Sequence, residues 1–256
     1  MSALAHYTVD GAVARLTLDS PNNRNALSTT LLRELRDGLD AAAGNPAVRA
    51  VVIGHTGGTF CAGVDLAEAT SDRADETGVG HMYDFVNLLR RIVELPVPVI
   101  AAIDGHVRAG GLGLAAACDI AVAGPASTFA LTEVRIGIGP AIISLTLLPK
   151  LAPRAASRYY LTGEKFGPQE AAEIGLVTVA ADDVQAAVAA FTAELAKGSP
   201  QGLRSSKALV AAPVLEGFDR KADELVKGAA ELFLSEEARE GIAAFREKRP
   251  PNWLQC

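Results

Sequence analysis

Small residues are concentrated in two segments of the chain, 59–66 and 105–113, and these segments could do chemistry through their backbone. Glycine and alanine let a ligand approach the main chain closely, and a helix that begins in such a segment presents unpaired N–H groups. Two such amides directed at one oxygen form an oxyanion hole, in which each donor lowers a reaction barrier by roughly 3–4 kcal/mol. The same composition is typical of tight packing turns, so it leaves both interpretations open.

Several further runs accompany these two segments in a fixed order. They are SPNNRNAL at 20–27, FCAGVDL at 60–66, AIDG at 102–105 with AGG at 109–111, ACDI at 117–120, Phe129 with Glu133 and Val134, and AFREKRP at 244–250. Each run alone is weak evidence. In their combined order and spacing, over nearly the full length, the chain resembles the enoyl-CoA hydratase/isomerase (crotonase) family.

The resemblance implies a fold and a chemistry. The fold is an α/β crotonase-like spiral of ββα units with a C-terminal helical oligomerisation arm, and the assembly is a homotrimer or a hexamer. The substrate is an acyl-CoA, so CoA arrives with the substrate and no metal or separate cofactor is needed. The reaction stabilises a thioester enolate and adds water across the double bond of the acyl group.

Roles at individual positions also follow from the resemblance. The backbone amides of Val64 and Gly110 match the family's oxyanion hole, and Glu133 matches a glutamate that transfers protons. A carboxylate in an apolar pocket has a raised pKa, which suits proton transfer near neutral pH. A salt bridge to Arg135 or a capping role is the alternative for Glu133.

Contacts to CoA are implied at a further set of positions: Arg24, Ala62, Val64, Asp65, Leu66, Phe245 and Lys248. The alternatives are a solvated Arg24, a packed Phe245 and a surface Lys248. The family's C-terminal residues often act from a neighbouring subunit.

The chain departs from the family pattern at several places. The second glutamate of the family's hydratases aligns with Gly113, and Ala109 replaces the first glycine of a triplet. Two other functions therefore stay open beside hydration. One is a double-bond shift that uses Glu133 alone, and the other is non-catalytic binding of acyl-CoA or RNA. The segment 131–144 is similar to bacterial members associated with 3-methylglutaconyl-CoA. Arg108 could bind an anionic ligand group or pair with an acidic side chain.

The elements that must position these residues alternate between strands and helices in the first half. We expect a hairpin at 6–9 and 12–18 with a type I′ turn at Asp10-Gly11, strands at 50–53, 99–103, 119–123 and 127–130, and a loop at 57–63. Helices are predicted at 28–43, with Ser28 as N-cap, and at 80–95. Another helix could start at 65–69, and an alanine-rich helix follows the segment 105–113 and ends at about Cys118. Further helices are predicted at 152–161, 169–174, 183–197, 216–233 and 236–245. We divide the chain into a core at 1–200 and an arm at 201–256.

Composition excludes several other classes of protein. The formal net charge of −6 argues against nucleic acid as a partner. The three cysteines are widely spaced, which is typical of a reducing compartment. The start of the chain lacks the features of a signal peptide, and no apolar run is long enough for a membrane span. We therefore expect a cytoplasmic protein without a metal site.

Overall fold

The computed structural model describes residues 3–65, 68 and 74–254, and it begins with the predicted hairpin. β1 (Ala5–Asp10) and β2 (Val13–Leu18) pair antiparallel, with Asp10 opposite Val13. The turn residues are therefore Gly11 and Ala12, and of these two only Gly11 has a positive φ, of 56°. A type I′ turn needs positive φ at both central residues, so the predicted turn type is wrong and the pattern is that of type II′.

The following strands alternate between two sheets, which confirms the predicted ββα spiral. β3 (Ala50–His55), β5 (Val99–Ile103), β7 (Ile120–Ala123) and β9 (Val179–Ala180) extend the hairpin into a six-stranded sheet of order β1-β2-β3-β5-β7-β9. β4 (Thr59–Cys61), β6 (His106–Arg108) and β8 (Thr128–Ala130) form a parallel three-stranded sheet. The sequence analysis missed β4, β6 and β9, and β4 lies in the segment that it assigned to a loop.

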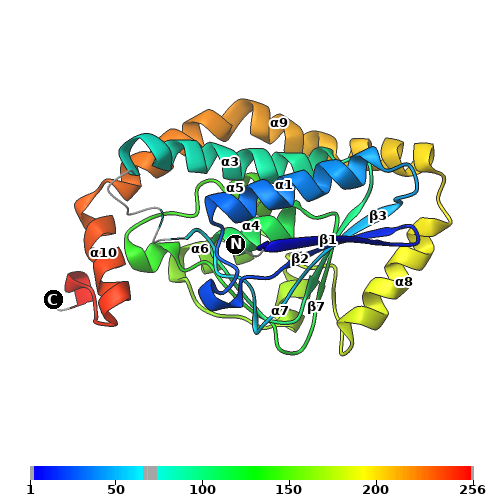
Figure 1. Cartoon of the computed structure of the whole chain (residues 1–256). Coiled ribbons are helices and arrows are strands. Elements are labelled where there is room, and N and C mark those ends of the chain that lie inside the picture. The colour runs from blue at the N-terminus through cyan, green and yellow to red at the C-terminus, as the bar shows by residue number, and fades with distance from the viewer. Residues whose placement is uncertain (1–2, 66–67, 69–73, 255–256) are drawn as a thin grey trace.

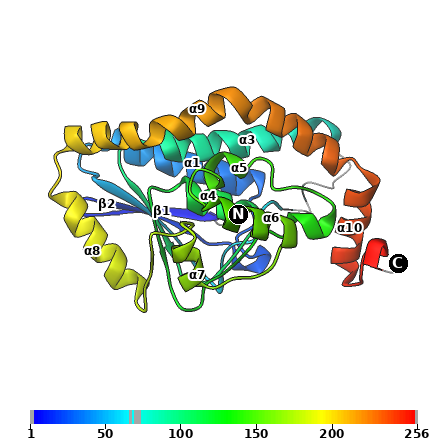
Figure 2. The same cartoon turned by 180° about the vertical axis from the view of Figure 1, so that it is seen from behind.

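Helices cover both faces of the large sheet (Figures 1 and 2). α1 (Thr29–Gly44), α3 (Ala74–Glu94) and α4 (Gly110–Ala117) pack on one face. α8 (Val184–Ala196) covers the other face, where it packs on Val52, Ile100 and Val122. α1 begins as predicted, because the Ser28 hydroxyl accepts a hydrogen bond from the Leu31 N–H at 3.3 Å.

The second half of the chain is mainly helical. Besides α8, the described α-helices of this half are α5 (Ser144–Leu147), α6 (Pro153–Thr162), α7 (Pro168–Glu173), α9 (Pro200–Phe233) and α10 (Glu236–Glu247). Short 3-10 helices lie at η1 (Pro21–Asn23), η2 (Glu133–Ile136) and η3 (Asn252–Leu254). α9 begins 16 residues before the predicted start at 216, and it contains Pro213, which lies before the predicted range.

A buried lysine fixes the first turns of α9 to the sheet. The ammonium of Lys207 donates to Asp119 Oδ2 at 2.7 Å and to the carbonyls of Ile92 at 2.9 Å and Val97 at 3.1 Å. Burial lowers the pKa of Lys207, and the neighbouring Asp119 opposes that shift. The beginning of the predicted arm is thus bonded to the predicted core. The division at residue 200 stays a prediction.

Within the described ranges, no helix is long and apolar enough to cross a bilayer. The same residues contain no group of three or more His, Cys, Asp or Glu side chains placed to hold a metal ion. Cys61 and Cys118 are free, and burial raises the pKa of each thiol to about 12. Such thiols are poor nucleophiles, so neither cysteine is a candidate for the chemistry.

Candidate active site

The two small-residue segments meet where β4 and β6 end. The Leu27 N–H donates to the Gly63 carbonyl at 2.7 Å, and the Asp65 N–H donates to the Leu27 carbonyl at 3.4 Å. This bridge passes over Val64 and uses neither of its backbone groups. Gly63 has a φ of 91°, and a Cβ at this position would lie 3.1 Å from the amide nitrogen of Gly110. Glycine at 63 is what allows the Val64 segment to approach Gly110.

Gly110 is the first residue of α4, so its N–H has no partner inside the helix. The turn before it is strained, because Ala109 has φ 48° and ψ −122°, a region that favours glycine. In the described part of the chain, neither the Val64 N–H nor the Gly110 N–H donates to a protein acceptor. Two unpaired amides therefore lie in adjacent segments, as an oxyanion hole requires.

Glu133 begins η2, three residues after β8 ends at Ala130, and only 7% of it is exposed. Its Oε2 has no hydrogen-bond partner among the described residues. Burial raises the pKa of Glu133 to about 7. Arg135 donates instead to the Thr162 carbonyl at 3.5 Å, and no ion pair joins it to Glu133 among the described residues, so the alternative of a Glu133–Arg135 salt bridge is wrong. A buried carboxylate of this pKa can both accept and release a proton near neutral pH.

One cleft of about 810 Å³ brings most of the predicted site residues together. Its lining includes Val64, Gly110 and Glu133 and the predicted contact residues Arg24, Ala62, Asp65, Arg108 and Phe245. Lys248 is exposed at the C-cap of α10 and does not line this cleft. Leu66 lies outside the described residues, as does most of the helix predicted from 65.

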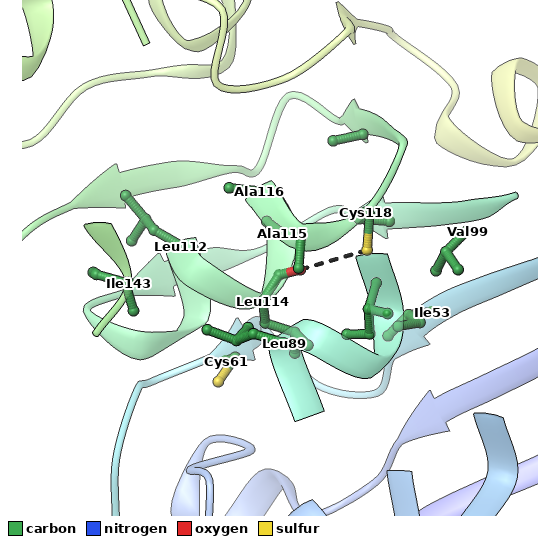
Figure 3. Packing of buried hydrophobic residues seen from close by; sticks show 14 of the residues in the cluster. Ile53, Cys61, Leu89, Val99, Leu112, Leu114, Ala115, Ala116, Cys118 and Ile143 are labelled. Atoms are coloured by element: carbon green, nitrogen blue, oxygen red, sulfur yellow. Dashed lines mark hydrogen bonds between the residues drawn. The ribbon is translucent and has the colours of Figure 1, made fainter. Parts of the chain in front are cut away.

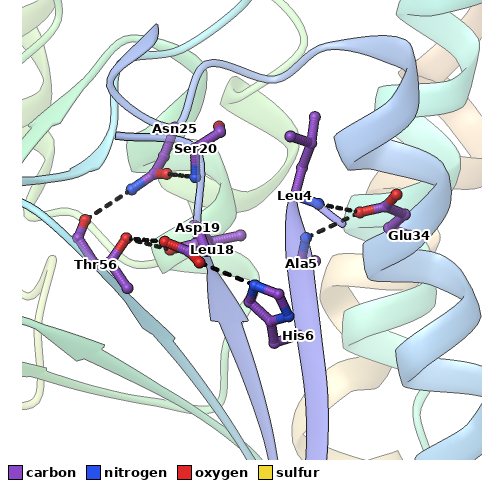
Figure 4. A network of polar contacts seen from close by, with 9 residues as sticks. All are labelled: Leu4, Ala5, His6, Leu18, Asp19, Ser20, Asn25, Glu34 and Thr56. Carbon is purple, nitrogen blue, oxygen red and sulfur yellow. Dashed lines mark hydrogen bonds and ion pairs between the residues drawn. The ribbon is translucent and has the colours of Figure 1, made fainter. Parts of the chain in front are cut away.

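An asparagine holds the loop that carries Arg24 (Figure 4). Arg24 and Asn25 both have positive φ, of 59° and 54°. The Asn25 side chain accepts from the Ser20 N–H at 2.7 Å and donates to the Thr56 and Thr59 carbonyls at 3.2 and 2.8 Å. The Ala62 N–H then donates to the Arg24 carbonyl at 3.1 Å. These bonds place Arg24 at the same end of β4 as Ala62.

Arg108 does not pair with an acidic side chain in the described structure, so that interpretation is wrong. Its guanidinium donates to the carbonyls of Val107 and Thr128 at 2.8 and 2.6 Å and to the Thr128 hydroxyl at 2.8 Å. Arg108 lies opposite Ala130 in the parallel β6–β8 pair, so a contact with Thr128 turns the side chain toward the beginnings of these strands. The amides of Val64 and Gly110 lie beyond the opposite ends.

Gly113 aligns with the second glutamate of the family's hydratases, and the space beside it is filled by Ile143. A Cβ at Gly113 would contact Cγ2 of Ile143 and lie 2.8 Å from its Cβ. Figure 3 shows Ile143 beside α4, close to Leu112. Ile143 is 3% exposed and forms part of the cleft wall. No carboxylate can therefore extend from residue 113 while Ile143 stays in place. Asp65 and Glu133 are the carboxylates among the described lining residues of the cleft, and only Glu133 is buried.

This contact gives a stability prediction. Gly113→Ala should lower the free energy of unfolding by about 1–3 kcal/mol, because the added methyl overlaps Ile143. Gly217→Ala is the matched control: it also lies inside a helix, but no atom lies within 4 Å of the added methyl. That change should stabilise the protein by about 0.5–1 kcal/mol. Chemical denaturation measures both, and equal effects of the two variants would contradict the packing at Gly113.

Sequence reasoning missed several residues of the cleft. Phe85, Ile142 and Phe233 line it, and Arg249 lies at its edge, where it pairs with Glu240 at 2.6 Å. Arg249 belongs to a run that carried the family resemblance, so that signal could have identified it. The apolar residues carry no comparable signal, because their spacing shows only that they face inward.

Known proteins resemble this chain in sequence and in fold. The sequence model of the enoyl-CoA hydratase/isomerase family matches residues 8–256. A solved enoyl-CoA hydratase from Mycobacterium avium is 60% identical, with a TM-score of 0.92 over 99% of this chain and 100% of the other. A second enoyl-CoA hydratase, from Mycobacterium avium subsp. paratuberculosis, is 28% identical, with a TM-score of 0.85 over 98% of each chain. Carnitinyl-CoA dehydratase from Proteus mirabilis is 31% identical over 99% of both chains.

Proposed function

This chain belongs to the enoyl-CoA hydratase/isomerase family, and from that premise we propose that it adds water across the double bond of an enoyl-CoA. The observation that supports the proposal most is the cleft that joins two unpaired amides to one buried, unpaired carboxylate. Amides of this kind stabilise negative charge on a carbonyl oxygen, and a carboxylate with a pKa of about 7 transfers protons.

The proposed steps use Glu133 twice. The thioester oxygen accepts hydrogen bonds from the amides of Val64 and Gly110, which withdraws electrons from the double bond. The ionised Glu133 removes a proton from water as the water oxygen bonds to the β-carbon, and the electron pair of the double bond moves to the thioester oxygen. The protonated Glu133 then returns its proton to the α-carbon. A single carboxylate is sufficient for this proton balance.

Isomerisation is the second candidate, and the Gly113–Ile143 contact favours it. A double-bond shift from a 3-enoyl-CoA to the conjugated 2-enoyl-CoA needs one base that removes a proton from the α-carbon and returns it to the γ-carbon. It does not need a water molecule positioned by a second glutamate. Non-catalytic binding is disfavoured by the buried Glu133, because an unpaired buried carboxylate lowers stability without serving a binding surface.

An assay on two substrates tests the proposal. Hydration of crotonyl-CoA removes the conjugated double bond, so the absorbance of the conjugated thioester falls. A double-bond shift in a 3-enoyl-CoA forms that conjugated thioester, so the same absorbance rises. We expect hydration, slow relative to typical family hydratases because Gly113 supplies no second carboxylate. If the protein shifts the double bond of the 3-enoyl-CoA but hydrates no enoyl-CoA, its activity is isomerisation. If it binds these compounds and catalyses neither reaction, the proposal of an enzyme is wrong.

The remaining expectations stay predictions. We propose an acyl-CoA as the sole ligand, with CoA supplied by the substrate, and a homotrimer or hexamer as the assembly. A cytoplasmic location and the 3-methylglutaconyl-CoA branch rest on the sequence. Arg108 turns away from the amide pair, so it favours a CoA phosphate over a carboxylate on the acyl group.

A further inference from the structure

Two hydroxyl groups form a hydrogen-bonded pair next to the wall of the cleft. Oγ of Ser144 lies 3.2 Å from Oη of Tyr160 and 2.7 Å from the Pro140 carbonyl oxygen. Because a carbonyl oxygen can only accept, Ser144 donates its proton to Pro140, and Tyr160 is the donor to Ser144. Both hydroxyl residues are partly buried, and neither of them lines the cleft. A substrate bound in the cleft would therefore not touch them.

Ser144 connects this pair to the helix that carries the Gly110 amide. Ser144 is the first residue of α5, and α5 is bound to α4. The Thr146 hydroxyl donates to the Gly113 carbonyl at 3.0 Å. Ile143, which precedes α5, fills the space beside Gly113. Since α4 begins at Gly110, the position of α5 is coupled to that amide.

Tyr160 connects the pair to the element that carries Glu133. It lies in α6, which packs on η2. The Arg135 guanidinium of η2 donates to the Thr162 carbonyl at the end of α6, at 3.5 Å. Burial raises the pKa of Tyr160 to about 12; the bond to Ser144 opposes this shift, and the nearby charge of Glu133 adds to it. Tyr160 is therefore a neutral phenol close to the carboxylate.

The small sheet does not by itself fix the distance between the amide and the carboxylate. The pairing of β6 with β8 ends at Arg108 and Ala130. Gly110 and Glu133 lie two and three residues beyond that last pair. Elements outside the sheet therefore contribute to holding the two groups, and the bond between α5 and α6 joins the elements that contact them.

We propose that Tyr160 is a positioning residue: its bond to Ser144 fixes the distance between Glu133 and the amide pair. This inference rests on the proposed function. The amide pair would hold the thioester oxygen while Glu133 moves the proton, so both groups must reach one substrate at once. A displacement of about 1 Å can lower a rate by about 10²-fold. Because Gly113 supplies no second carboxylate, every proton transfer depends on the position of Glu133.

Removing the hydroxyl of Tyr160 tests the inference. Tyr160→Phe should lower kcat by roughly tenfold and change KM by about twofold or less, because the lining of the cleft stays the same. The substrate is crotonyl-CoA, or a 3-enoyl-CoA if the protein catalyses the double-bond shift. Ser144→Ala breaks the same bond and should lower kcat by a similar factor. The double variant should be no slower than Ser144→Ala alone, because the bond can be lost only once.

Tyr159→Phe is the matched control. It removes the neighbouring hydroxyl of α6, which donates to Oε1 of Glu170 at 2.6 Å, on α7 and outside the cleft. This variant should lose stability and keep its kcat. Circular dichroism and thermal unfolding show which variants are folded, and if Tyr160→Phe is not, Ser144→Ala alone decides.

Three results would overturn the inference and leave the proposed function standing. They are full kcat in the folded variant that lacks the bond, an equal loss of kcat in Tyr159→Phe, and additive losses in the double variant. If the unmodified protein is inactive toward both substrates, the proposed function is wrong, and the inference falls with it.

Discussion

Glu133→Gln should lower enoyl-CoA turnover by about 10²–10⁴-fold and change acyl-CoA binding little. Glutamine keeps the size of the side chain but cannot accept the proton from water or return it to the α-carbon. Since Gly113 has no side chain and Ile143 fills the space beside it, no carboxylate at that position can take over the role of Glu133. Steady-state kinetics gives the turnover, and titration with a saturated acyl-CoA gives the binding.

The pH profile separates a proton-transfer role from a purely structural one. Burial raises the pKa of Glu133 to about 7, and the base must be ionised, so kcat/KM of the unmodified protein should rise with pH through that value. Glu133→Gln should lose this rise. The same shift means that Glu133 contributes stability fully at pH values below its unfolded pKa and loses that contribution as pH rises through about 7. The glutamine variant should therefore gain relative stability above neutral pH.

Glu173→Gln on α7 is the control, because it is the same substitution at an exposed residue outside the cleft. It should leave turnover and the pH profile unchanged. A fully active Glu133→Gln protein would remove Glu133 from the mechanism. A variant that has lost stability at every pH would show a structural role instead.

Local patterns allowed much of the fold to be predicted. Ser28 and the leucines at 31, 32, 35 and 39 specify α1, because a cap and a periodic apolar face are both local signals. β4 and β6 could not be predicted in this way. Each has three residues inside a glycine-rich segment, and each is a strand because its neighbours in the small sheet pair with it. Pairing across 47 residues, as between Thr59 and His106, leaves no trace in the local sequence.

The candidate site, like the fold, could be predicted from the sequence only in part. The sequence resemblance identified Val64, Gly110 and Glu133, and the structure places them around one cleft. The sequence also showed that Gly113 lacks a side chain, but not that Ile143 occupies the space. Packing partners distant in sequence decide such details, and they decided the direction of Arg108 as well.

Gly110→Pro should lower turnover by about 10²–10³-fold relative to Gly110→Ala, because only the proline variant loses the amide that is proposed to hold the thioester oxygen. Proline is tolerated at the first position of a helix, where Gly110 lies and where its N–H has no intrahelical partner. Both variants add a Cβ, which would lie 3.2 Å from Leu27 Cδ1 and 3.4 Å from Gly63 Cα. The alanine variant therefore measures the cost of the added Cβ. Circular dichroism and thermal unfolding establish that both variants are folded, and kcat for crotonyl-CoA gives the ratio. If the two folded variants have equal kcat, the Gly110 amide plays no part in the reaction, and the oxyanion must be held by other donors.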